Sequence, residues 1–440
     1  GMIVAAGDFT SFNDAAVRYV ARLHENGLLD QTLAPNIVTA MGGGPTALAV
    51  QTNGGILCGG DMLSVDGVGS QNFGRLDARG RLHTGFVGVS PDDYVLAIGI
   101  DPAGYLRCGG LFTTFDSLPR RRIAELTAEG EVSPYFTNGV KGNVGYVYTL
   151  TTLTSQHVLV TGTFTNIAGA TKSRIALLGA DGYLNPSFTA VANGTIYSTA
   201  VRPDGGIVVA GSFTRLNLTD RAGLGAFRSD GTLNPDFNPS PDAPVWSVLA
   251  QPDGKVLVGG AFTNIGGGTS PKLARLRSNG TLDPTFTPPV ITDGRVMSLA
   301  LRADGDVIAA GSFTNVTGTT FRRFAQFASN GAPRSSYSAY TRASNDVAGL
   351  AIQPDGKVLA VGRFIKVANM DRVHMVRFLS NNKAAARTLE ADTNGTWVAW
   401  TLAGSCPQVW QARFESSSDG TNWTRLGVAA WTNGVWKLSG

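Results

Sequence analysis

Groups that cross-link or catalyse are scarce in this chain. Its 440 residues include three cysteines and four histidines. Cys58 and Cys108 each stand two residues before a recurrent glycine, where a later copy has Val258, so a small buried hydrophobe is favoured over a disulfide or metal role. The histidines fall at unrelated positions of the repeat described below, namely His24, His83, His157 and His374. We therefore expect no metal site and no cofactor.

Long apolar runs and strong charge are also lacking. No apolar segment reaches the roughly eighteen residues that span a bilayer, so no membrane span is expected. There are 36 basic and 32 acidic residues, and nucleic-acid binding is not expected because the basic ones are not clustered. No signal peptide is present, yet residues 1–9 align with 254–262 without the strand expected before them, so we expect that a leader or further repeats were removed.

Glycine, by contrast, is abundant and periodic. Eight short apolar runs end in Gly-x-Phe, or once Gly-x-Met, at intervals close to fifty residues. The recurrent glycines are Gly7, Gly60, Gly110, Gly162, Gly211, Gly260, Gly311 and Gly362. A period of this length indicates a solenoid, a propeller or an array.

The clearest copy, residues 245–286, predicts four short strands. Two β-type runs flank the turn at Asp253-Gly254, a third run covers 273–277, and 281–286 forms a short outer strand or turn. Four such strands are typical of a propeller blade. We predict an all-β, eight-bladed β-propeller of four-stranded blades over residues 1–384, with seven blades as the fallback. A β-helix is ranked well behind because its repeats are shorter.

Two recurrent side chains have predicted roles. The anchor aromatics are expected to fill the wedge between neighbouring blades: Phe9, Phe112, Phe164, Phe213, Phe262, Phe313 and Phe364. Burying each contributes about 1.5–3 kcal/mol. Fifteen residues past the glycine, four copies have arginine: Arg22, Arg75, Arg275 and Arg377. Pairing with neighbouring blades or carbonyls is the favoured role, and ligand contact by Arg275 and Arg377 is the alternative.

A third signature follows, and it is specific. The motif Leu-Asp/Asn-Pro-x-Phe occurs at 184–188, 233–237 and 282–286. Asp or Asn before proline favours a turn, and metal binding by Asp283 is the weaker interpretation. Together with Gln-Pro-Asp-Gly-Lys-Val-Leu at 251–257 and 353–359, residues 1–382 resemble the delta-60 repeat, a bacterial β-propeller repeat of unknown function. The resemblance implies a large secreted or surface protein and transfers no catalytic residue.

The composition changes in the tail, residues 385–440. Six of the seven tryptophans lie there, in four β-type runs. Part of it, 396–402, is expected to supply the strand missing from the first blade, and the alternative is a small separate β-unit packing on the side. A compact aromatic core is favoured for the tryptophans, and a sugar-stacking surface with contacts from Trp410, Trp423 and Trp431 is the alternative.

These observations favour a non-catalytic binding or structural module of a secreted or cell-surface bacterial protein. Adhesion-like recognition of a protein or carbohydrate by a monomer is expected, with 166–172 and 264–271 as contact loops. The alternative is a propeller-type glycan-acting hydrolase or lyase with channel carboxylates. No nucleophile elbow, phosphate loop or EF-type calcium loop is present in the sequence.

Overall fold

The structure is a computed structural model that forms two compact units, Gly1–Thr195 (unit 1) and Ile196–Gly440 (unit 2). It describes residues 2–12, 15–24, 28–33, 35–41, 44–51, 53–77, 79–101, 103–134, 136–137, 145–153, 157–319, 321–334, 342–353, 356–368, 370–371, 375–378, 386–392, 396–404, 406–409, 412–418, 424–432 and 435–439. Strands dominate these ranges, in which the one helix is the 3-10 turn η1 (Thr84–Phe86). No helix in the same ranges has the length and apolar character to cross a membrane.

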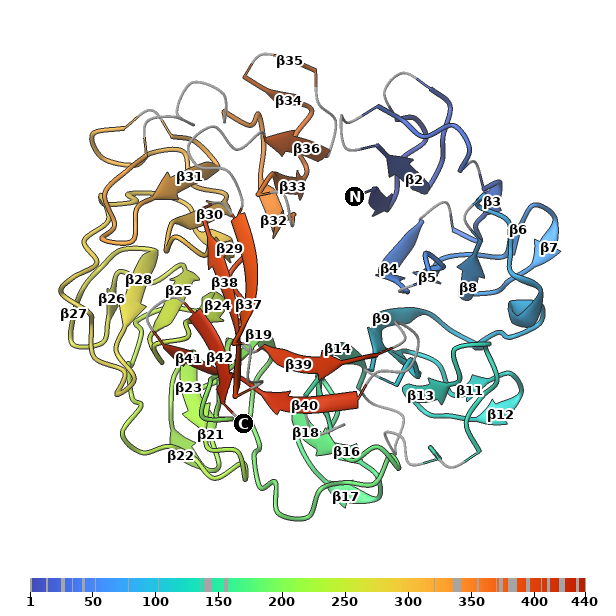
Figure 1. The fold of residues 1–440 in the computed structure, drawn as a ribbon, viewed down its shortest axis with the longest axis horizontal. Coiled ribbons are helices and arrows are strands. Elements are labelled where there is room, and N and C mark those ends of the chain that lie inside the picture. The colour runs from blue at the N-terminus through green and yellow to red at the C-terminus, as the bar shows by residue number, and fades with distance from the viewer. Residues whose placement is uncertain are drawn as a thin grey trace. The chain divides into compact units, whose positions relative to one another are not determined.

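Unit 2 begins with four antiparallel repeat sheets of three strands each. Their first strands are β19 (Ile196–Val201), β24 (Val245–Ala250), β29 (Val296–Leu301) and β32 (Val347–Ile352). The central strands are β20 (Ile207–Gly211), β25 (Val256–Gly260), β30 (Val307–Gly311) and β33 (Val358–Gly362). The third strands are β23 (Leu224–Phe227), β28 (Leu273–Leu276), β31 (Phe324–Phe327) and β36 (Met375–Phe378). Figure 1 shows β24, β25 and β28 side by side.

Unit 1 repeats the same arrangement. Its three-stranded sheets are β4 (Pro45–Val50), β5 (Ile56–Gly60), β8 (Phe73–Leu76); β9 (Val95–Ile100), β10 (Leu106–Gly110), β13 (Ile123–Leu126); and β14 (Val147–Thr152), β15 (Val158–Gly162), β18 (Ile175–Leu178). The first sheet has two strands, β1 (Ile3–Ala6) and β2 (Val20–Leu23), which match a central and a third strand.

The fourth strand predicted for each repeat is wrong. In the described residues the ladder ends after the third strand, and the outer segment adds one isolated bridge, such as Leu276↔Leu282. The reason is the turn that follows. The Asp283 carboxylate accepts the Thr285 backbone N–H, the Phe286 N–H donates to the Asp283 carbonyl, and Pro284 has no N–H to donate, so pairing cannot continue.

The predicted variable loops are regular two-residue hairpins. Each hairpin has two short strands: β6 (Ser64–Val65) with β7 (Val68–Gly69), β11 (Thr114–Phe115) with β12 (Leu118–Pro119), β16 (Asn166–Ile167) with β17 (Ala170–Thr171), β21 (Arg215–Leu216) with β22 (Thr219–Asp220), β26 (Asn264–Ile265) with β27 (Gly268–Thr269), and β34 (Lys366–Val367) with β35 (Met370–Asp371). In the first hairpin, β6 also pairs with β3 (Ile37–Val38). In the hairpins whose two turn residues are both described, both have positive φ, as in Gly266-Gly267, which fits a type I′ turn. Ile167 and Ile265 are buried, so each hairpin belongs partly to the core.

Six of the seven anchor aromatics are buried as predicted, and Phe9 is half-buried. In unit 2, Phe262 is fully buried in one cluster with Val208 of the preceding sheet and Val258 of its own. The second aromatic of the same repeat also bridges sheets, since Phe286 packs with Val307 of the next one. Met62, which replaces the anchor Phe in one copy, is equally buried. In the repeat of Phe262, the contacts between neighbouring sheets are therefore filled by these two aromatic side chains.

A left-handed residue precedes most third strands. Lys272 has φ 68° and Arg323 has φ 66°. The Lys272 carbonyl accepts the N–H of the recurrent Gly260, and the Lys272 N–H donates to the Phe262 carbonyl. The same pair of bonds recurs at Asn72, Arg122, Arg174, Gly223 and Arg323. This hydrogen-bond pattern keeps non-glycine residues in a conformation that L-residues otherwise avoid.

The tail forms its own small sheets. β37 (Ala386–Ala391), β38 (Trp397–Ala403), β42 (Val435–Ser439) and β41 (Ala430–Thr432) pair in that order, and β39 (Arg413–Ser416) pairs with β40 (Thr424–Val428). Because β37 and β42 occupy both edges of β38, the prediction that 396–402 completes the first blade is wrong, and the separate β-unit is observed. The tail docks within unit 2, where Gln408 and Cys406 bond the turn after β29.

Candidate functional site

A β-bulge gives every first strand one outward-aimed residue near its start. In β24 the ladder passes from Val245↔Gly260 to Ser247↔Gly259, so Trp246 has no partner residue in β25. The same shift leaves out Tyr197 in β19 and Met297 in β29. Bulges re-aim a side chain at the cost of local pairing. Three consecutive sheets of unit 2 thus each present one large side chain at the same end.

In β19, β24 and β29, a serine follows the bulge and joins neighbouring first strands. Ser198 Oγ accepts the backbone N–H of Val248 at 3.2 Å, and Ser247 Oγ accepts that of Leu299 at 3.2 Å. Ser298 continues the series to Leu350 at 3.1 Å. These bonds fix the spacing of the strands, so the bulge residues beside them are held at fixed distances too.

The result is a stacked group on the surface of unit 2. The rings of Tyr197 and Trp246 are parallel within 6°, with centroids 4.4 Å apart. The guanidinium carbon of Arg295, the residue before β29, lies 4.3 Å from the centroid of the Trp246 ring. All three side chains are half-buried. We call this group the aromatic–arginine patch, Tyr197, Trp246 and Arg295.

Arg295 is held in place mainly by its backbone and by the indole. Its N–H donates to Ser312 Oγ at 3.1 Å, and its carbonyl accepts the Ser312 N–H at 3.0 Å. In the part of the chain that the structure describes, no carboxylate lies within ion-pair distance of its guanidinium. The patch therefore combines two aromatic rings with a cation that has no acidic partner there.

Unit 1 has similar chemistry at the equivalent end of its own repeats. Tyr148 is the bulge residue of β14, and its ring centroid lies 6.2 Å from that of Tyr146. Both rings are exposed. The guanidinium carbon of Arg122 lies 5.7 Å from the Tyr146 centroid. Aromatic rings beside arginine are thus a feature of this end of the repeat in each unit.

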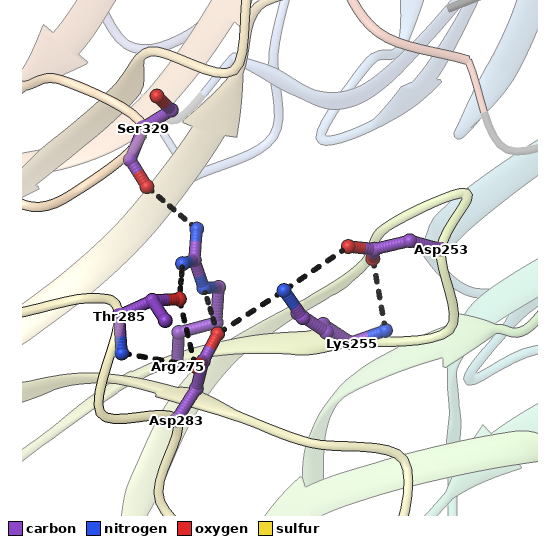
Figure 2. A network of polar contacts seen from close by, with 6 residues as sticks. All are labelled: Asp253, Lys255, Arg275, Asp283, Thr285 and Ser329. Atoms are coloured by element: carbon purple, nitrogen blue, oxygen red, sulfur yellow. Dashed lines mark hydrogen bonds and ion pairs between the residues drawn. The ribbon is translucent and has the colours of Figure 1, made fainter. Parts of the chain in front are cut away.

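Arg275, a predicted contact residue, is instead buried in a network that joins two sheets (Figure 2). Its Nε donates to Asp283 Oδ2 at 2.8 Å, and its Nη1 donates to the Ser329 carbonyl of the next repeat at 2.6 Å. Its Nη2 donates to Thr285 Oγ1 at 2.9 Å, and the guanidinium lies 4.9 Å from the Phe286 ring. The pairing role that the sequence favours is the one observed, and ligand contact by Arg275 stays an untested prediction.

The carboxylate of Asp283 collects the donors of this network. Burial alone would raise the pKa of Asp283, but hydrogen bonds from the Thr285 N–H and hydroxyl and from Arg275 outweigh it and hold the pKa well below its usual range. Lys255 adds an ion pair with Asp283 at 3.3 Å. Asp30 has the same surroundings in unit 1, where the Thr32 hydroxyl contributes most and the pKa falls to about 2. These carboxylates act as structural anchors.

The other predicted contact residues are less informative. Trp410 and Trp423 lie outside the described residues. Trp431 is half-buried, pairs with Trp436 across β41 and β42, and packs on the cluster around Trp436, which supports the aromatic-core interpretation of the tail. Arg377 is half-buried in β36 and remains a prediction.

Chemistry-bearing groups elsewhere are placed structurally. Cys58 and Cys108 are fully buried, and burial raises the pKa of the Cys58 thiol to about 12. Two carboxylates, Asp101 and Glu125, converge on the buried guanidinium of Arg107, at 3.4 and 2.7 Å. Among the described residues, no three His, Cys, Asp or Glu side chains form a group able to hold a metal ion.

The patch is not among the residues predicted from the sequence, although the sequence contains a pattern that points to it. Trp246 is the one tryptophan outside the tail, and Tyr148, Tyr197 and Trp246 occur at the spacing of the repeat. The bulge at these three positions has no sequence signature of its own. In a regular strand, the same residues would simply belong to one face of the alternating pattern.

Comparisons with known proteins support the fold and leave the activity open. The family described as "Domain of unknown function (DUF5122) beta-propeller" matches residues 1–33, 157–188, 251–286, 302–333 and 353–381. No curated protein matches the sequence. The described residues form an all-β structure, as the glycine period predicts, and five of its segments are similar to this β-propeller domain, while ring closure and the delta-60 name stay predictions.

Three solved structures are similar at low scores. The WD40 β-propeller domain of Doa1 has 13% identity and a TM-score of 0.45, covering 77% of this chain and 93% of that one. The extracellular domain of a candidate one-component system from B. thetaiotaomicron has 10% identity and a TM-score of 0.26, covering 96% and 56%. The calcium-binding protein regucalcin from Agrobacterium tumefaciens has 14% identity and a TM-score of 0.31, covering 60% and 80%. None of these adds to the account of the site.

Proposed function

We propose that this chain is a non-catalytic recognition module that binds a protein partner through the aromatic–arginine patch. The observation that carries the proposal is the parallel stack of Tyr197 on Trp246 with Arg295 against the indole. Three successive repeats contribute one residue each, on strands whose spacing is fixed by the Ser198 and Ser247 hydrogen bonds. Contact side chains on a rigid scaffold lose little entropy when a partner binds.

The composition of the patch favours a protein partner. Tyrosine, tryptophan and arginine dominate the binding energy of protein interfaces, and methionine is enriched there as well. Met297 is the bulge residue of the next sheet and is half-buried like the other three. Carbohydrate recognition is the alternative to protein recognition, and a sugar would stack on exposed faces of the aromatic rings.

The proposal includes features of the whole protein. The repeat sheets are taken as eight blades that close a ring, with seven blades as the fallback. The module is placed in a secreted or cell-surface adhesion-like protein of a bacterium and acts as a monomer. These points rest on the repeat count and on the resemblance to the delta-60 repeat.

The test is selection of ligands with the full chain. A phage-displayed random peptide library and a glycan array are probed in parallel with the wild-type protein, Trp246→Ala and Tyr197→Ala. We expect peptides to be enriched by the wild type, with binding reduced at least about tenfold by either substitution, since truncating a hot-spot aromatic costs more than about 2 kcal/mol. Unchanged melting temperatures show that the variants are folded.

Two further variants separate the patch from other exposed rings. Tyr183→Ala removes an aromatic ring that is 60% exposed and outside the patch, and Trp431→Ala removes a half-buried ring of the tail. Neither is expected to change peptide binding. The proposal is overturned if no peptide is enriched, or if enriched peptides bind Trp246→Ala as well as the wild type. Glycan binding that depends on Trp431 would move the site to the tail.

A further inference from the structure

We infer that the partner of the aromatic–arginine patch is an acidic peptide segment, whose Asp or Glu carboxylate pairs with Arg295 while its neighbouring apolar residues cover Tyr197 and Trp246. This inference rests on the proposed function and adds the chemistry of the ligand. It follows from the charges around Arg295, from the faces that the two rings leave open, and from the contrast with the other arginines of the repeat.

The acidic groups near Arg295 in the chain are already occupied. Asp293 accepts hydrogen bonds from the backbone N–H of Thr314 at 2.8 Å and of Asn315 at 2.9 Å, and from the Thr314 hydroxyl. Asp346 pairs with Arg323 at 2.6 Å. Neither carboxylate forms an ion pair with Arg295 in the described part of the chain.

Structural arginines of the same repeats have their partners. Arg275 uses all three guanidinium nitrogens inside the protein, and Arg107 pairs with two carboxylates. Arg295 differs because the contact recorded for its guanidinium is the face of Trp246. Stacking on an aromatic ring holds the guanidinium of Arg295 while its two Nη groups stay available for a planar, bidentate carboxylate; its Nε is buried without a hydrogen-bond partner among the described residues.

One further cation, on the neighbouring repeat, also has no carboxylate partner among the residues described. Lys272 Nζ donates to the Ala261 carbonyl at 2.6 Å, whereas the charge of Arg323 is already paired with Asp346. Lys272 has no carboxylate partner in the described part of the chain, so its charge is stabilised by a backbone dipole alone. Local potential thus favours an anionic ligand over a neutral one.

The ring faces already used within the patch favour a peptide over a sugar. Tyr197 and Trp246 each use one ring face on the other, and Arg295 also lies against the Trp246 ring. A pyranose stacks on an open ring face, whereas a peptide side chain can pack against ring edges and the half-buried side chain of Met297. An acidic, partly apolar peptide uses every group of the patch.

The experiment compares paired peptides on the folded full-length chain. Each peptide selected by the wild type, and a random acidic set, is synthesised in a Glu or Asp form and in the matching Gln or Asn form. Affinities are measured for the wild type, Arg295→Gln, Arg295→Lys, Trp246→Ala and the control Arg277→Gln, an exposed arginine outside the patch.

We expect the acidic forms to bind the wild type about ten- to hundredfold more tightly than the amide forms. Arg295→Gln should reduce this ratio to about one, Arg295→Lys should retain part of it, and Arg277→Gln should leave it unchanged. Equal affinity of acidic and amide forms overturns the inference, and if Trp246→Ala still abolishes binding, the proposed function survives. Arg295-dependent binding of an immobilised uronate oligosaccharide, with no peptide bound, overturns the peptide class.

Discussion

Arg275 connects two repeats through the backbone of Ser329, since its Nη1 donates a 2.6 Å hydrogen bond to the carbonyl of that residue, 54 positions along the chain. The same guanidinium pairs with Asp283 of its own repeat. Arg75 reaches Ala128 and Arg302 reaches Gly356 over nearly the same separation. Buried arginines therefore act as fixed links between consecutive sheets in each unit.

Replacing Arg275 by leucine should destabilise unit 2 by about 3 kcal/mol, because it removes the buried guanidinium that pairs with the Asp283 carboxylate and leaves Thr285 and the partly exposed Lys255 as its partners. The double variant Arg275→Leu/Asp283→Asn should recover part of this loss. That pair occurs naturally in unit 1, where Leu177 and Asn185 occupy the same two places of the repeat. Urea unfolding of the wild type, both single variants and the double variant measures the coupling. Additive effects would contradict the link.

Acid should weaken the same network. The pKa of Asp283 is lower in the folded protein than in the unfolded chain, so its contribution is present above about pH 4 and is lost as the pH falls towards the folded value. Asp30 behaves alike, with its loss between 3.8 and about 2. Asp283→Asn should lower the melting temperature at pH 6 and have a steadily smaller effect down to pH 2. A difference independent of pH would show that the charge is not involved.

The anchor aromatic should be the largest single contribution of each wedge. Phe262→Ala removes a fully buried ring and should cost about 3–5 kcal/mol. Phe262→Met should cost less than about 1.5 kcal/mol, because Met62 fills the same place in another repeat without exposure. Denaturant midpoints of the two variants test this. Equal losses would mean that the shape of the ring, and not the filled volume, is required.

The left-handed residue before the third strand should tolerate glycine but not a β-branched side chain. Lys272→Val is expected to be about 1–2 kcal/mol less stable than Lys272→Gly, because valine pays the steric cost of φ 68°. Both variants lose the Nζ bond to the Ala261 carbonyl, so that contact cancels in the comparison. The natural Gly223 at this place, with φ 66°, is the precedent. Equal stability would contradict the assigned strain.

Much of the fold follows from the sequence. The glycine period gave the repeat, the Asp-Gly pairs gave the central turns, and Phe112, Phe164 and Phe262 are buried where predicted. Two expectations were wrong for local reasons. The Asp-Pro turn ends the ladder before a fourth strand, and the tail pairs with itself. The predicted contact loops are hairpins with buried Ile167 and Ile265, and their role in contacts stays a prediction.

The site was less accessible from the sequence. Arg22 with Asp30, and Arg275 with Asp283, occur as charged pairs eight residues apart, while Leu177 with Asn185 is neutral. This co-occurrence indicates a structural pair and could have removed Arg275 from the contact residues. The position of Trp246 beside Tyr197, by contrast, depends on the bulges and on Ser198, which only the folded sheets bring together.

The most direct test uses the indole N–H signals of the seven tryptophans, with Trp246 assigned from a Trp246→Phe variant. A peptide selected by the full chain is titrated into the ¹⁵N-labelled protein. The account predicts that the Trp246 signal shifts with the binding curve while Trp400, Trp431, Trp436 and the other tail signals do not move. Shifts confined to tail tryptophans, with Trp246 unchanged, would contradict recognition through the aromatic–arginine patch.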